Sequence, residues 1–259
     1  IDSVGFDMSN LLIFKHDELQ DPLDDDDIVR LYNNGLVFDY SRFSKADKLV
    51  LWWKMEDALG TAIADSSGKG HNGTAEFSMS NHSPTPALAL REYNDLPFSI
   101  SFWIRPDSTS SGDKHTIISK SDAYDASYQV GEELGEWAVY YDGSNVVLQL
   151  FDTVGDSNTY GQSAAVKYTF NSILSANAWK FVTITYDPTV ASLSNRAKIY
   201  SGGYTTNSTM TGTTASNLLN TNNYQYMQPT DYVTVIGSSP VVKDLQSTPV
   251  KGLGGRLSN

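Results

Sequence analysis

Acidic side chains supply most of the groups in this chain that could do chemistry, with 30 Asp and Glu against 18 Lys and Arg. Glu132, Glu133 and Glu136 form a cluster of carboxylates at spacings of one, three and four residues. In an extended strand, successive side chains point to opposite faces, so this spacing makes a poor pair of general acid and general base. We therefore expect no catalysis at this cluster.

Nucleophilic chemistry has little support in the sequence. The chain contains no cysteine, which excludes thiol catalysis, disulfides and thiolate metal sites. Histidines stand at 16, 71, 82 and 115, but no Gly-x-Ser-x-Gly elbow surrounds any serine. We interpret the histidines as isolated surface side chains and expect the protein not to be an enzyme. An orphan hydrolase is a third hypothesis, for which no sequence feature selects the carboxylate.

The acidic run Asp24–Asp27 has the oxygen ligands that calcium prefers, but it lacks the alternating Asp or Asn and the closing Glu of an EF-hand. Ile28, Leu31 and Tyr32 follow it at the i, i+3, i+4 spacing of one helix face. Acidic residues are favoured at a helix N-terminus by the macrodipole. The pattern predicts a short helix over 28–32, started by a solvated acidic loop and ended at 33–35.

Short strands are predicted from residue 48 onward, because apolar runs alternate with Gly, Asn, Ser and Asp. The clearest alternation is in 98–105, where the even-numbered apolar residues share one face and Trp103 points to the other. Residues 141–146 predict a hairpin with Asp-Gly at its tip. The Thr-, Asn-, Gly- and Ser-rich stretch 202–230 predicts a long exposed loop. The expected strands are 49–55, 87–91, 98–105, 116–120, 136–141, 146–151, 165–170, 179–186, 196–200 and 232–236.

This succession of strands beside one short N-terminal helix predicts an all-β fold, a two-sheet antiparallel jelly-roll sandwich. Four segments in order resemble the laminin-G-like, concanavalin A-like jelly-roll family. They are Leu51–Asp57 with Asp65–Thr74, Phe98–Pro106 with Ile117–Lys120, Trp179–Asp187, and Val235–Ser239. The resemblance implies a concanavalin A-like domain over 48–259. Sugar hydrolases of this fold carry a Glu-x-Asp-x-x-Glu strand motif, which no glutamate here begins.

The family's closing strand and helix resemble residues 1–35, which stand at the opposite end of the chain from their usual place. The pattern is that of a circular permutation, a tandem array or a strand-exchanged assembly, with 36–47 as a linker. An open sheet edge must be filled by a strand, either from the same chain or from a neighbour. Because the chain begins without Met and ends where the closing strand would start, we favour the neighbour. Identical subunits or neighbouring repeats are then the partners.

The resemblance also implies one structural Ca²⁺ at the sheet edge. Its ligands would be Asp65, Asn72, Glu56 and Asp2, which offer the hard oxygen atoms that calcium accepts. The alternative is that Asp65 and its Ser, Gly and Asn neighbours only form a turn, with side-chain oxygens bonded to nearby amides.

Glycan binding needs exposed aromatic rings and short polar groups. The candidate ligand-binding residues are Trp137, Tyr140, Tyr224 and Tyr226, with Trp52 or Trp53 and Tyr160 as further candidates. The alternative for each ring is packing inside the sandwich or between subunits.

A net charge of −12 makes nucleic acid and anionic membrane surfaces improbable partners. No apolar run is long enough to span a bilayer, so we expect no membrane insertion. The sequence favours a non-enzymatic structural or adhesive module of a filament, cell surface or virion, extracellular in location, with glycan binding as a further capacity. The alternative is a carbohydrate-binding module of a secreted glycoside hydrolase.

Overall fold

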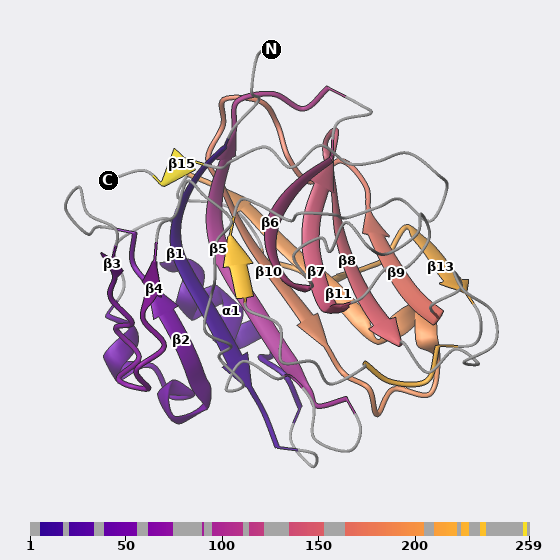
Figure 1. Cartoon of the computed structure of the whole chain (residues 1–259), viewed down its shortest axis with the longest axis horizontal. Helices are drawn as coiled ribbons and strands as arrows, with labels where there is room; N and C mark the ends of the chain where they lie inside the picture. The colour runs from indigo at the N-terminus through magenta and orange to yellow at the C-terminus, as the bar shows by residue number, and fades with distance from the viewer. Residues whose placement is uncertain are drawn as a thin grey trace, which may run out of the picture.

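A computed structural model describes residues 6–17, 21–33, 39–55, 62–74, 90, 95–110, 114–121, 135–152, 164–204, 210–221, 224–227, 234–236 and 256–257. Within these ranges the chain is mostly β-structure with one α-helix, α1 (Asp25–Tyr32). Two large sheets face each other, which confirms the predicted β-sandwich (Figure 1). Short 3-10 helices occur at η2 (Tyr40–Arg42), η3 (Ala46–Lys48) and η5 (Leu193–Asn195).

Among the described residues, the first sheet has seven strands and the second has six. The seven-stranded sheet runs in the order β12 (Thr213–Thr214), β11 (Ala197–Gly203), β10 (Lys180–Tyr186), β5 (Phe98–Pro106), β1 (Phe6–Lys15) and β15 (Arg256–Leu257), with β2 (Leu49–Trp53) paired to β1. The six-stranded sheet runs in the order β13 (Asn217–Thr221), β9 (Ala164–Phe170), β8 (Asn145–Asp152), β7 (Gly135–Asp142), β6 (Lys114–Ser121) and β14 (Thr234–Ile236). A separate small sheet pairs β3 (Ala62–Ile63) with β4 (Gly73–Thr74).

The main core lies between the two large sheets, and alternation along the strands fills it. Phe98, Ile100, Phe102 and Ile104 of β5 all belong to this core, as their spacing predicts. The hairpin between β7 and β8 is also confirmed. Its two-residue loop begins at Gly143, whose φ of 60° is a conformation that glycine adopts without steric cost.

A second apolar cluster covers the outer face of the seven-stranded sheet. Ile28 and Leu31 of α1 pack there together with Leu12 of β1 and Phe181 of β10. The helix begins three residues earlier than the apolar spacing predicts, because the side chain of Asp24 caps it by accepting a hydrogen bond from the Asp27 backbone N at 2.8 Å. Both faces of this sheet are therefore buried over much of its area.

Residues 6–15 complete the seven-stranded sheet, in the place that a closing strand would occupy. β1 pairs antiparallel with β5 along one edge, from Phe6 opposite Pro106 to Lys15 opposite Phe98. On its other edge it pairs with β2. Within this chain β1 thus fills the open edge itself, which is the first of the two geometries that the sequence allows. Exchange of the strand with a neighbour stays a prediction.

Two further expectations differ from the structure. The stretch 202–230 is not one long loop, because β12 and β13 lie within it and pair with β11 and β9. His16 and His115 are buried and not on the surface. Of the expected strand 87–91, all residues except Leu90 lie outside the described part. Within the described part, no helix has the length and apolar character needed to cross a membrane.

Candidate binding surface

The carboxylate of Asp65 is the centre of a tight turn. Its Oδ1 accepts hydrogen bonds from the backbone N of Trp52 at 3.0 Å and of Ser67 at 2.9 Å. Its Oδ2 accepts from Ser67 Oγ at 2.8 Å and from the His71 backbone N at 2.9 Å. Burial alone would raise the pKa of Asp65, but the hydrogen bonds from Ser67, Trp52 and His71 outweigh it and hold the pKa below its ordinary value.

These contacts leave little room for calcium at the turn. A carboxylate offers about four lone-pair directions, and the four donors occupy those of Asp65. Asn72 Oδ1 accepts a hydrogen bond from the Asp65 backbone N. Glu56 and Asp2, the other two expected ligands, lie outside the described residues. Among the residues that are described, no three His, Cys, Asp or Glu side chains could together hold a metal ion.

We therefore expect Asp65 to stabilise the protein as a turn residue. Replacing Asp65 with alanine should lower the free energy of unfolding by about 1–3 kcal/mol, because it leaves part-buried donors without an acceptor. Thermal unfolding of the wild type in excess chelator should be unchanged. Asp187→Ala is the matched control, since Asp187 forms a similar but exposed turn with Thr189. If chelator lowers the melting temperature of the wild type but not that of Asp65→Ala, the result would support the calcium hypothesis.

Three of the four expected glycan-binding rings are buried. Trp137 is fully buried in the main core, and Tyr140 is buried beside Val147. Tyr224 is buried as well, and its hydroxyl donates to Asp95 Oδ2 at 2.6 Å. These rings cannot stack on a sugar at the surface, because other side chains already cover them. Tyr226 is half-buried and is the one that remains accessible.

The hydrogen bond to Asp95 holds the Tyr224 side chain in the interior. This buried carboxylate accepts hydrogen bonds from Tyr224, from the hydroxyl of Tyr186 at 2.9 Å and from the Met227 backbone N at 2.6 Å. Burial, followed by the charges of its neighbours, raises the pKa of the Tyr224 hydroxyl well above its ordinary value. The phenols therefore stay protonated as donors, and the contact fixes residues 224–227 to the sandwich.

A different pair of rings is accessible on the outer face of the seven-stranded sheet. Tyr204 directly follows β11 and is 72% exposed. Its ring lies edge-on to the half-buried Trp103 of β5, with 6.0 Å between centroids and 70° between planes. The alternation in 98–105 correctly predicted that Trp103 points away from the core. No pattern in the sequence indicates Tyr204, because its partner is about a hundred residues away.

Two buried aromatic side chains pack against Trp103. Tyr32 of α1 stacks on it at 6.0 Å and 29°, and Phe181 of β10 packs against it at 5.5 Å. The Tyr32 hydroxyl donates to the backbone O of Gly203 at 2.6 Å, which fixes the end of β11. Gly202 makes this approach possible, since a Cβ there would lie 3.1 Å from Tyr32 Cε2.

Polar groups stand next to these rings on β1 and β5. Ser9 lies directly opposite Trp103 and therefore on the same face of the sheet. Arg105, two residues along β5 from Trp103, donates to Asp7 Oδ2 through Nε and Nη2. We call Trp103, Tyr204, Ser9, Asp7 and Arg105 the aromatic ledge. It joins accessible ring surface to hydroxyl, carboxylate and guanidinium groups, which is the composition of a binding surface.

The fold is a β-sandwich, and the ledge lies on the outer face of its seven-stranded sheet. The family model described as "Clostridium neurotoxin, N-terminal receptor binding" matches residues 88–233, more than half of the chain. The chain therefore belongs to this family. The family that matches is not the laminin-G-like family that the sequence motifs resemble, although both predict a β-sandwich.

Among the solved structures that show a likeness to this chain is the "Botulinum Neurotoxin Type G Receptor Binding Domain". It is 15% identical, with a TM-score of 0.28, over 70% of this chain and 42% of that chain. This chain thus corresponds to less than half of that solved chain. None of the curated proteins matches it.

Proposed function

We propose that this chain is a non-enzymatic module with which a secreted or surface protein binds its receptor. The observation that carries the proposal is the match over 88–233 to a family described by receptor binding. Those residues include every strand from β5 to β13, and so draw on both large sheets. The family likeness therefore lies in the sandwich itself and not in an appended segment.

Carbohydrate is the receptor chemistry that we propose. The net charge of −12 disfavours an anionic partner, and the ledge pairs accessible aromatic surface with hydrogen-bonding groups. A carbohydrate-binding module of a secreted hydrolase uses the same chemistry and is the second candidate. The two differ in the glycan, which is a cell-surface oligosaccharide for the first and a bulk polysaccharide for the second.

An array that carries cell-surface oligosaccharides, together with soluble and insoluble polysaccharides, tests this proposal. We expect the full chain to bind a subset of the oligosaccharides saturably, and the heat-unfolded chain to bind none. Binding to polysaccharides alone would favour the second candidate. Binding to neither, with retained binding to intact cells, would show that the receptor is not a carbohydrate.

The relation to laminin-G-like domains stays a proposal that rests on the four segments, and so does the division into 1–35, 36–47 and 48–259. Because β1 lies within the seven-stranded sheet, we regard the first and last of these parts as one sandwich. The pairing of β1 within its own chain gives no support to a filament built by strand exchange, and we do not include one in the proposed function.

A further inference from the structure

We propose that Trp103 and Tyr204 form a stacking platform for one neutral sugar ring, with Ser9, Asp7 and Arg105 as hydrogen-bonding groups for its hydroxyls. This inference rests on the proposed function, in which the receptor is a carbohydrate. It goes beyond that function by naming the residues and the charge of the ligand.

The platform is preorganised. Trp103 packs against both Tyr32 and Phe181, which contact each other, so its ring orientation is fixed before any ligand arrives. The ring of Tyr204 contacts that of Trp103. Tyr204 also directly follows Gly203, whose backbone O accepts a hydrogen bond from the Tyr32 hydroxyl. A rigid aromatic surface loses little conformational freedom on binding, which favours affinity.

The size of the platform suits a sugar ring better than a protein. Its accessible apolar surface consists of one exposed ring, Tyr204, and part of a second, Trp103. A stable protein interface buries roughly 800 Å² on each partner. A pyranose presents a small apolar face of C–H groups, which the face of one ring can cover while the second ring, inclined by 70°, contacts the edge of the sugar. Its hydroxyls lie at the rim.

The charges around the platform favour a neutral ligand. The Arg105 side chain is 40% exposed, but both its Nε and Nη2 donate to Asp7, so its charge is already neutralised. A sugar carboxylate on the ledge would therefore meet the carboxylate of Asp7 and a guanidinium that is already paired with it.

The polar groups offer both kinds of hydrogen bond. Asp7 has acceptor capacity beyond the bonds to Arg105, and the guanidinium of Arg105 has donors beyond Nε and Nη2. Ser9 Oγ accepts from Asn10 Nδ2 at 3.0 Å and can still donate. Sugar hydroxyls both donate and accept, so this set matches their chemistry.

The experiment is a titration of the full chain with the neutral oligosaccharide that binds best on the array, by calorimetry. We expect Tyr204→Ala to weaken binding about tenfold or more, because it removes the ring. Tyr204→Phe, which keeps the ring, should bind within about twofold of the wild type. Leu219→Ala is the matched control, since Leu219 is an exposed apolar side chain on the opposite sheet. Trp103→Phe, with a smaller ring, should fall between the alanine variant and the wild type.

Each other outcome overturns the inference in a distinguishable way. If Tyr204→Ala binds the oligosaccharide as tightly as the wild type does, the ledge is not the binding site, but the proposed function stands. Equal losses in Tyr204→Phe and Tyr204→Ala would assign binding to the hydroxyl and exclude stacking. A sialylated glycan bound in preference to its neutral parent would contradict the charge argument. A protein receptor whose binding is lost in Tyr204→Ala, with no glycan bound, would overturn carbohydrate as the ligand.

Discussion

Replacing Glu136 with glutamine should lower the free energy of unfolding by about 3–5 kcal/mol, because it leaves a buried ammonium group without its counter-charge. Lys120 and Glu136 are both 0% exposed, and Lys120 Nζ lies 2.7 Å from Glu136 Oε2. Glu136 Oε1 also accepts a hydrogen bond from the backbone N of Leu90 at 3.1 Å. The carboxylate therefore joins β6, β7 and Leu90.

A double-mutant cycle separates the pair from its surroundings. Lys120→Met removes the charge and keeps the length of the side chain. Glu136→Gln keeps an oxygen for Leu90. The double variant should be more stable than Glu136→Gln alone, because no unpaired charge is then buried. Urea unfolding of the wild type, both single variants and the double variant measures the coupling energy.

A surface ion pair provides the control. Lys48 Nζ lies 2.8 Å from Asp17 Oδ2, but the Asp17 side chain is 74% exposed. Asp17→Asn should change stability by less than about 1 kcal/mol, as is usual for exposed pairs. If Glu136→Gln costs no more than Asp17→Asn, the buried pair does not hold the two strands as described.

The Lys120–Glu136 pair shows what the sequence could and could not reveal. Spacing alone indicated that the glutamates around Glu136 form a poor acid and base pair. It could not indicate a salt bridge, because the pairing depends on the register between β6 and β7. A register shift between Lys120 and Ser121 further alters the regular alternation of faces.

The sequence predicts which side chains share a face of a strand better than it predicts which other elements pack on that face. In β5 the alternation separates Phe102, which points to the core, from Trp103, which points away. It does not show that α1 and the 3-10 helices bury the outer face, so that Trp52 is enclosed there while Trp53 lies in the main core. The residues around Trp137 did not indicate which face of their strand meets the core, and the structure places this ring in the main core.

Composition misled where backbone pairing decides the structure. The polar stretch 202–230 has little to bury, but Leu218 and Asn220 of β13 pair with Tyr168 and Val166 of β9. Composition cannot reveal such an edge strand, because its pairing depends on the register with the neighbouring strand. Tyr204 at the start of this stretch was overlooked for that reason.

Acidification should destabilise the wild type more than a His16→Leu variant, by about 2–3 kcal/mol between pH 7 and pH 4.5. His16 is 1% exposed, and neither ring nitrogen has a hydrogen-bond partner among the described residues. Burial, and then the charges of Lys45 and Lys48, lower the pKa of His16 from 6.5 to about 4. Asp17 and Asp47 act in the opposite direction but do not compensate.

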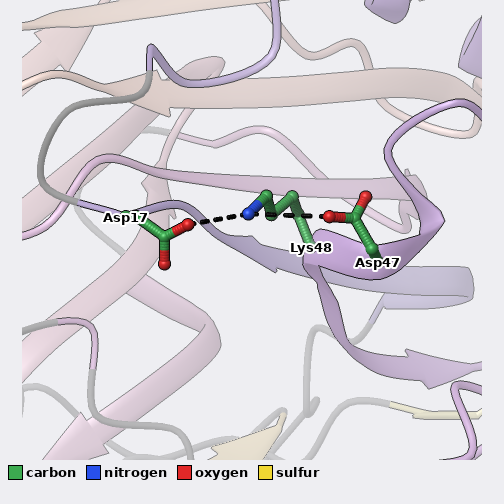
Figure 2. A network of polar contacts seen from close by, with 3 residues as sticks. All are labelled: Asp17, Asp47 and Lys48. Atoms are coloured by element: carbon green, nitrogen blue, oxygen red, sulfur yellow. Dashed lines mark hydrogen bonds and ion pairs between the residues drawn. The ribbon is translucent and has the colours of Figure 1, made fainter.

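The charges around His16 persist over this pH range. Figure 2 shows Lys48 between the carboxylates of Asp17 and Asp47, at 2.8 and 3.5 Å. The hydrogen bond with Asp17 raises the pKa of Lys48, and the same bond lowers the pKa of Asp17. Lys48 therefore stays cationic while the imidazole would titrate, and it opposes a second positive charge beside it.

The sign of the effect follows from the depressed pKa. Above pH 6.5 the imidazole is neutral in both states and has no effect on the pH dependence. Below pH 6.5 the unfolded chain binds a proton that the folded chain does not bind until about pH 4, so acid favours unfolding. The stabilisation is thus complete above pH 6.5 and lost as the pH falls toward 4. Urea unfolding of both proteins at pH 7, 6, 5 and 4.5 measures it, and subtracting the two profiles removes the contribution of the other groups. His16→Gln, which keeps a polar side chain but cannot titrate, should follow the leucine variant. Equal losses in all three proteins would show that His16 is protonated in the fold and that its burial does not exclude the charge.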